Sequence, residues 1–182
     1  MIEDFTQFLE KHLAESRVAD PQRATRVFVP DGEDVSESDI KQAESDLGVR
    51  LPHSYRQFLL MCGPGLWCDD YIPHPRDLYA FDEDCWETAG FVTLIHNVLG
   101  CGDYVAINPS DPEKDGERPL YYCAHDPFGY AQVAASFEEW CRKAVDAQGM
   151  DATVYDDVED EVHAKWKEYL ASRPKKWWQF WR

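Results

Sequence analysis

The chain has no long run of apolar residues and no excess of basic ones. No apolar stretch approaches the roughly 18 residues needed to cross a lipid bilayer. Lys and Arg total 18 against 35 Asp and Glu, which gives a formal net charge of −17. Because proteins bind a phosphate backbone through cations that replace its counterions, this charge argues against direct nucleic-acid binding. The same charge favours solubility and fast encounter with a basic partner.

Motifs that carry cofactors, metals or export signals are missing as well. The sequence has no P-loop, no G-x-G-x-x-G and no G-x-S-x-G. Its six cysteines, at positions 62, 68, 85, 101, 123 and 141, show no paired C-x-x-C spacing. The first residues, MIEDFTQFLEKH, carry acids and no apolar segment of the kind found in secretory signals. We therefore expect a cytoplasmic protein with reduced thiols and with neither a cofactor nor a metal.

One short group of reactive side chains is the candidate for an enzyme site. Cys123, His125 and Asp126 lie close together in the sequence, and the Asp could orient the imidazole. His125 and Asp126 fall in a predicted turn with no convincing nucleophile, and four-ligand zinc sites usually show two tight ligand pairs. We interpret the cysteines as small buried hydrophobes and expect no enzyme activity. Convergence of the three side chains in a pocket would favour an enzyme.

Residues 35–65 predict two short helices joined by a tight elbow. Ser36 is a favourable N-cap, and Asp39 can complete an acidic variant of the capping box. Pro52 suits the first turn of the second helix, and a glycine follows each helix. Apolar residues recur at helical spacing, with Ile40, Ala43 and Leu47 on the first helix and Tyr55, Phe58, Leu59 and Cys62 on the second.

The second half of the chain predicts a run of consecutive strands. Short turns separate the expected strands, which are Phe91–Val98, Asp103–Asn108, Arg118–Ala124 and Tyr130–Ala134, and Arg26–Val29 is a further short edge strand. Ser136 is then placed to cap a helix, with Glu139 in the capping-box position. Because the helices lie before and after the strands rather than between them, the pattern is typical of an α+β fold with an antiparallel meander.

Two parts of the sequence resemble the signature of the SUKH superfamily, the Smi/Knr-like proteins. The usual Asn-Gly after the second helix is Cys62-Gly63 here. The likeness spans roughly residues 35–145, and it implies a curved, mostly antiparallel sheet flanked by helices. The matching residues, to which we assign structural roles, are Ile40, Glu44, Leu47, Gly48, Leu51, Pro52, Tyr55, Phe58, Leu59 and Gly63, followed by Gly102, Asp103, Ser136 and Phe137.

The resemblance also implies a function. Bacterial SUKH proteins are largely immunity proteins that block a cognate toxin domain, often a nuclease or a deaminase, whereas eukaryotic relatives act as scaffolds. An acidic partner would be steered onto a basic nuclease and would occlude its cleft. We therefore expect a non-enzymatic immunity protein that is monomeric when free. The alternative is a scaffold protein of the same fold that docks its partners through a Trp-rich C-terminal tail.

Residues 66–87 hold the candidate partner-binding residues. This segment is expected to be irregular, and it is rich in aromatic and acidic side chains. Tyr and Trp favour the centre of an interface, with charged residues at its rim. In the competing interpretation, the aromatic residues fill the core and the acids are simply solvated. The candidates are Trp67, Asp69, Asp70, Tyr71, Asp82, Glu83, Asp84 and Trp86.

The predicted organisation is one core domain with two appendages. Residues 1–34 form an amphipathic helix and a connector, residues 35–148 form the SUKH-like core, and residues 149–182 hold an acidic run, a last helix and a basic tail. The tail, RPKKWWQFWR, carries no acid. Three roles stay open for it: folding back onto its own domain, docking another protein, or lying at a membrane interface without stable insertion.

Overall fold

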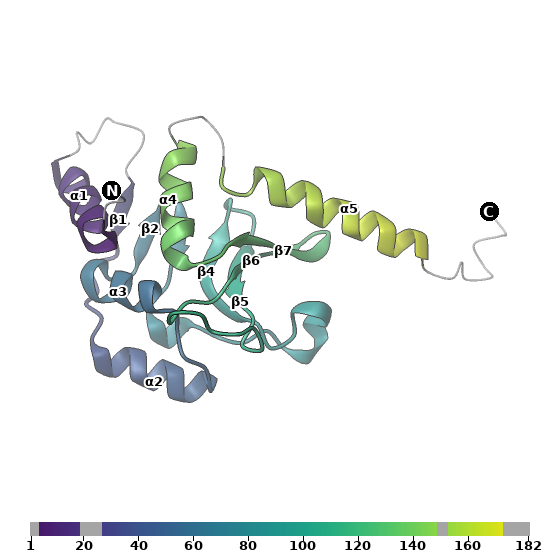
Figure 1. Ribbon diagram of the computed structural model, residues 1–182, viewed down its shortest axis with the longest axis horizontal. Coiled ribbons are helices and arrows are strands. Elements are labelled where there is room, and N and C mark those ends of the chain that lie inside the picture. Colours follow the sequence, from purple (N-terminus) through teal and green to yellow (C-terminus); the bar gives the residue numbers. More distant parts are fainter. Residues whose placement is uncertain (1–3, 19–26, 149–152, 173–182) are drawn as a thin grey trace.

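The computed structural model describes residues 4–18, 27–148 and 153–172, and these ranges form one α+β unit, as expected (Figure 1). The helices are α1 (Phe5–Val18), α2 (Glu37–Leu47), α3 (His53–Cys62), α4 (Phe137–Gln148) and α5 (Asp156–Ser172), with short 3-10 helices η1 (Pro75–Asp77) and η2 (Glu83–Thr88). The strands are β1 (Phe28–Pro30), β2 (Gly65–Trp67), β3 (Asp70–Ile72), β4 (Val92–Val98), β5 (Asp103–Ile107), β6 (Leu120–His125) and β7 (Phe128–Ala134).

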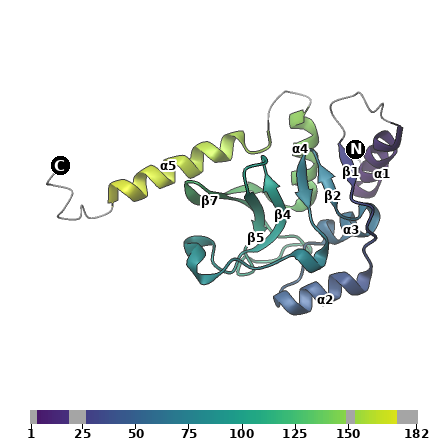
Figure 2. The same cartoon turned by 180° about the vertical axis from the view of Figure 1, so that it is seen from behind.

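All seven strands belong to one curved, unclosed sheet. The strand order follows the chain, from β1 to β7, and every neighbouring pair is antiparallel. The predicted meander is therefore confirmed, and it extends further toward the N-terminus than expected. In both views α1, α3 and α4 lie together, whereas α5 extends away from them past β7 (Figure 1 and Figure 2).

Large aromatic side chains fill the space between these three helices and the sheet. The Phe58 ring of α3 lies 5.4 Å from Trp67 and 5.5 Å from Phe137, with both pairs edge to face. The Trp67 indole N–H donates to the carbonyl of Cys141, which ties β2 to α4. All three rings are fully buried, and burying one such side chain contributes about 1.5–3 kcal/mol. This cluster places α3 and α4 on one face of the sheet.

The predicted elbow between α2 and α3 is confirmed. Ser36 and Asp39 form the expected capping box. The Glu44 carboxylate on α2 accepts from the backbone N–H of Leu51 at 2.9 Å and from the guanidinium of Arg56 at 3.1 Å. Because one carboxylate bonds both the elbow and α3, Glu44 fixes the angle between the two helices.

Gly63, which ends α3, is required by its position. Its φ of 72° lies in the left-handed region, and an added Cβ would lie 2.6 Å from the carbonyl oxygen of Glu33. A larger residue would strain the backbone and would also displace the connector before α2. The glycine of the Cys-Gly pair therefore keeps its structural role, although the residue before it departs from the family pattern.

The segment expected to be irregular, residues 66–87, contains the hairpin of β2 and β3. Trp67 pairs with Asp70, so only Cys68 and Asp69 form the turn. Both have positive φ, 51° and 73°, which matches the tight turn that suits the twist of two antiparallel strands. Asn-Gly or Asp-Gly usually marks this turn, so the Cys-Asp pair gives no sequence signal for the hairpin. Similarly, β7 begins at Phe128 rather than at Tyr130, because His125 pairs directly with Phe128.

Helix α5 packs against β7, the last strand of the sheet. Val162 on α5 is fully buried, and it approaches Gly129 so closely that an added Cβ would lie 2.9 Å from a Val162 methyl group. The contact between Val162 and Gly129 therefore fixes the helix on β7.

A buried carboxylate connects the hairpin to the two C-terminal helices. Asp70 is only 6% exposed and accepts hydrogen bonds from the Tyr155 hydroxyl at 2.7 Å and from the Leu99 backbone N–H at 3.3 Å. The Trp140 indole N–H donates to the same Tyr155 hydroxyl at 3.1 Å. Burial raises the pKa of Asp70 to about 6. Burial thus favours the protonated form of Asp70, and this form predominates below about pH 6 in the folded protein.

We predict that Gly129→Ala destabilises the fold by about 1–3 kcal/mol, because the new methyl group has no space beside Val162. Equilibrium urea unfolding of Gly129→Ala, Val162→Ala and the double variant measures this effect. The double variant should cost less than the sum of the two single variants, since the shortened side chain makes room for the new methyl group. Strictly additive costs would contradict the close contact.

We also predict that Asp70 makes stability depend on pH. Its folded pKa lies above the ordinary value of 3.8, so the stability it contributes is present at low pH and is lost as pH rises through about 6. Between pH 4 and pH 7, Asp70→Asn should therefore gain up to about 3 kcal/mol relative to the wild type. Urea unfolding at several pH values tests this, with Asp69→Asn as the exposed control. Parallel pH profiles for wild type and Asp70→Asn would contradict it.

Candidate partner-binding face

The face of the sheet opposite α3 and α4 carries a continuous set of aromatic side chains. Residues directly opposite each other on neighbouring strands share a face, and the register pairs Tyr71 with His96 and pairs Tyr104 with Cys123, which in turn pairs with Tyr130. The segment before β4 contributes two more rings that contact Tyr104. We call this set the aromatic face: Tyr71, Tyr79, Phe81, Phe91, His96, Tyr104, Tyr121 and Tyr130.

The rings of the aromatic face hold one another in fixed positions. Tyr104 lies 5.5 Å from Phe81 and 5.4 Å from His96, and Tyr130 lies 5.2 Å from Phe91 and 5.7 Å from Tyr121. The Phe81, Phe91 and Tyr121 contacts are edge to face or tilted, which is the favoured geometry for aromatic pairs. Rings that are already ordered lose little conformational freedom on binding, so they suit the anchors of an interface.

Carboxylates hold the hydroxyl groups of two of these tyrosines. The Tyr121 hydroxyl donates to Asp111 at 2.6 Å, and the Tyr71 hydroxyl donates to Asp31 at 2.7 Å. Partial burial and the neighbouring carboxylates raise the pKa of both phenols to about 12. Both tyrosines are therefore neutral donors at neutral pH.

His96 adds no positive charge to the aromatic face at neutral pH. Its ring is half-buried and lies 3.0 Å from the Thr93 hydroxyl. Burial lowers the pKa of His96 below its ordinary value, because desolvation disfavours the charged imidazolium. The histidine therefore contributes a neutral aromatic ring to this surface.

Acidic side chains surround the aromatic face. Asp82, Glu83 and Asp84, at the start of η2, are exposed beside Phe81. On another side, a groove of about 780 Å³ runs between α2 and η1, and Tyr79 lines both this groove and the aromatic face. The acids that line the groove are Glu33, Asp34, Asp39 and Asp46, and its cation Arg76 is paired with Glu33 at 2.6 Å. The region as a whole therefore presents aromatic rings within a negative rim.

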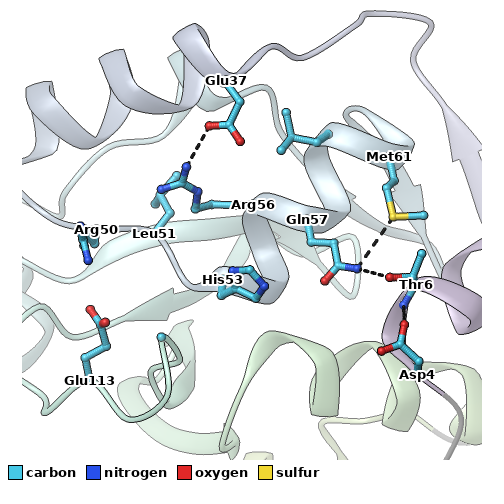
Figure 3. A pocket seen from close by; sticks show the side chains of 12 residues that line it. Asp4, Thr6, Glu37, Arg50, Leu51, His53, Arg56, Gln57, Met61 and Glu113 are labelled. Carbon is cyan, nitrogen blue, oxygen red and sulfur yellow. Dashed lines mark hydrogen bonds and ion pairs between the residues drawn. The ribbon is translucent and has the colours of Figure 1, made fainter.

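A second hollow lies between α1, the elbow and the loop of residues 113–116 (Figure 3). It encloses about 670 Å³, and charges of both signs line it. Arg56 pairs with Glu37 at 2.9 Å, and the Gln57 amide donates to the Thr6 hydroxyl at 2.7 Å. These side chains bind one another and join the helices together, so we assign this hollow a structural role.

The structure does not bring the predicted interaction residues together on one surface. Tyr71 belongs to the aromatic face, and Asp82, Glu83 and Asp84 lie at its rim. Asp69 is exposed in the turn of the β2–β3 hairpin, whereas these acids lie at the start of η2. Trp67 and Asp70 point to the helix side, where both are buried. The side chain of Trp86 lies outside the described residues.

Sequence reasoning missed most of the aromatic face. Tyr104, Tyr121 and Tyr130 were placed in strands but were not proposed as binding residues. Alternation within the strands was the available signal, because Tyr104 and Tyr121 are half-buried whereas Val105 and Leu120 beside them are fully buried.

The candidate enzyme residues do not converge in the structure. Cys123 is buried, its thiol donates to the carbonyl of Tyr121, and burial raises its pKa well above the ordinary value. The His125 ring instead lies 2.5 Å from Asp103. Within the described ranges, no group of three or more His, Cys, Asp or Glu side chains is arranged to hold a metal ion. No helix there is both long and apolar enough to cross a membrane.

The second family motif also has structural roles. Asp103 accepts hydrogen bonds from the Tyr122 hydroxyl at 2.5 Å and from the His125 backbone N–H at 2.9 Å, which ties β5 to β6. Burial alone would raise the pKa of Asp103, but these hydrogen bonds hold it below the ordinary value. Ser136 accepts from the N–H of Glu139 at the start of α4, as its capping role predicts.

Comparison with known proteins agrees with this fold. No curated protein matches the sequence. The model of the SMI1 / KNR4 family (SUKH-1) matches residues 34–143, from just before α2 into α4. The match covers more than half of the chain and includes every motif residue named above, so it confirms the resemblance to the SUKH superfamily. This protein belongs to the SMI1 / KNR4 family (SUKH-1).

Proposed function

We propose that this protein is a non-catalytic immunity protein that neutralises a cognate toxin domain by covering its active site with the aromatic face. The observation that carries the proposal is the aromatic face itself, a set of ordered rings inside an acidic rim. The membership of this protein in the SUKH family is consistent with an immunity function. We further propose that the target is a basic domain, such as a nuclease, and that the free protein is a cytoplasmic monomer.

Charge and aromatic surface would have separate roles in such an interaction. The formal net charge of −17 attracts a basic partner over a distance, which raises the association rate. Once the surfaces meet, desolvated aromatic anchors supply most of the binding free energy and slow dissociation. A nuclease must carry cations to hold its substrate, so the same cations would bind the acidic rim when the cleft is occluded.

The segments outside the family match are proposed to be appendages of one domain. Helix α1 contacts α3 and β1, and α5 contacts β7, so both pack on the core. Neither contributes to the motif residues of the family. We therefore retain the division into residues 1–34, 35–148 and 149–182 as a proposal about organisation.

A scaffold function is the second candidate, and α5 carries the observation that favours it. Trp166 and Tyr169 are in ring contact on the distal half of this helix, and Leu170 beside them is 48% exposed. The Trp-rich residues 173–182 follow directly and lie outside the described residues. If the protein is a scaffold, truncation after Ser172 together with Leu170→Ala should abolish capture of its partners while the circular dichroism spectrum stays unchanged.

The immunity proposal predicts rescue of cells from a toxin encoded beside this gene. Co-expression of the wild-type protein should restore growth, and Tyr79→Ala should weaken toxin binding by about 1–3 kcal/mol, or roughly five- to 150-fold in Kd. Leu60→Ala is the matched control, because Leu60 and Tyr79 are both 40% exposed but Leu60 lies on α3. Growth assays and calorimetric titration measure the two effects.

Several outcomes would count against the immunity proposal. Equal loss of binding in Leu60→Ala and Tyr79→Ala would remove the aromatic face from the interface. Rescue that depends on Leu170 but not on Tyr79 would move the interface from the aromatic face to α5. Absence of any neighbouring toxin gene, together with no rescue from any toxin tested, would contradict toxin neutralisation itself.

A further inference from the structure

A lysine from α5 lies over one ring of the aromatic face. The Lys165 ammonium group is 5.8 Å from the centre of the Tyr130 ring and 3.5 Å from the Tyr130 carbonyl oxygen. A cation within about 6 Å of a ring centre is attracted by the negative face of the ring. The free protein therefore already holds a cation against the aromatic face, and this cation belongs to its own chain.

The contacts of Lys165 are weak enough to be exchanged. Both the ring distance and the carbonyl distance lie at the outer limit for such interactions. Its closest partner is Glu161 on the same helix, at 2.6 Å, and both side chains of that pair are about half exposed. Exposed ion pairs of this kind contribute little to stability. The lysine side chain can swing away without moving α5, because Val162 anchors the helix on β7.

We propose that the aromatic face is a surface for guanidinium groups, so that the partner inserts arginine side chains among its tyrosine rings. The position over Tyr130, which Lys165 occupies in the free protein, is one of the seats for such a side chain. The inference rests on the proposed function only because both take the aromatic face as the docking surface. It adds which chemical group of the partner, the guanidinium, this surface recognises.

The arrangement fits arginine better than lysine. A guanidinium is planar and more weakly hydrated than an ammonium, so it stacks on tyrosine rings at a lower desolvation cost. The half-buried Tyr121 and Tyr130 rings lie next to each other over the buried Phe91 ring, and Asp111 holds the Tyr121 hydroxyl at the rim. A stacked guanidinium would therefore have a carboxylate close by for its N–H groups. Arg118, which follows in the same loop, is largely buried and bonds the backbone carbonyls of Pro109 and Asp111.

The test uses the full chain and two labelled peptides, octa-arginine and octa-lysine, at physiological salt. Fluorescence anisotropy should give a Kd for octa-arginine that is roughly five-fold lower than for octa-lysine. Tyr130→Leu should reduce this preference, because one of the rings that bind a guanidinium is lost. Tyr130→Phe should keep it, because the ring remains, and this variant also controls for loss of packing between β6 and β7.

Two lysine variants distinguish binding over the Tyr130 ring from general charge attraction. Lys165→Met and Lys167→Met each remove one positive charge from an exposed position on α5, but only Lys165 lies over Tyr130. Lys165→Met should tighten octa-arginine binding by roughly three-fold or more, whereas Lys167→Met should change it little. Equal effects of the two variants would overturn the inference, and so would equal affinities of the wild-type protein for the two peptides.

The same measurements keep this inference separate from the proposed function. If the protein rescues cells from a toxin but shows no preference for arginine, the guanidinium surface is wrong and the immunity function stands. If the arginine preference and its dependence on Tyr130 are found without rescue, the surface chemistry stands and toxin neutralisation is wrong.

Discussion

The packing of α3 and α4 on one face of the sheet decides what the other face can do. A fully buried cluster of Phe58, Trp67 and Phe137 covers the apolar side chains on that side of the sheet. The segment between β3 and β4 packs on the opposite face, to which it contributes aromatic rings rather than a long helix. An antiparallel sheet tolerates a face of this kind, because its strands alternate between a buried side and a more exposed one. The aromatic face is therefore a consequence of where the core lies.

Most of the fold was predictable because its signals are local. Ser36 and Asp39 cap a helix by contacts within four residues, and the apolar spacing of α2 and α3 is visible in the sequence alone. The β2–β3 hairpin was missed because its turn residues, Cys68 and Asp69, are not those that usually adopt positive φ. In that turn the conformation is imposed by the pairing of Trp67 with Asp70, and pairing between strands is a tertiary property.

The candidate site was harder to predict than the fold for a related reason. Trp67, Asp70 and Tyr71 lie within five residues, yet the first two point into the core and only Tyr71 points to the aromatic face. A shift of one residue along a strand reverses the face on which a side chain lies, so composition alone could not separate them. Tyr79, which lies outside the strands, joins the same surface through its ring contacts with Tyr104 and His96. Such a contact follows from the path of the chain around the sheet, which no short sequence window contains.

The family motif and the aromatic face are made of different residues, and this separation bears on function. Glu44 joins α2 to α3, Gly63 leaves space for the backbone of the connector before α2, and Asp103 ties β5 to β6. Each of these motif residues serves the scaffold, and none of them belongs to the aromatic face. A chain can therefore keep the motif while its tyrosines and rim acids change, because the two sets consist of different residues. Family membership thus establishes how the protein folds, and the choice of partner is left to side chains that the motif does not include. The chemistry of those side chains, rather than the family itself, is what an account of its partner must explain.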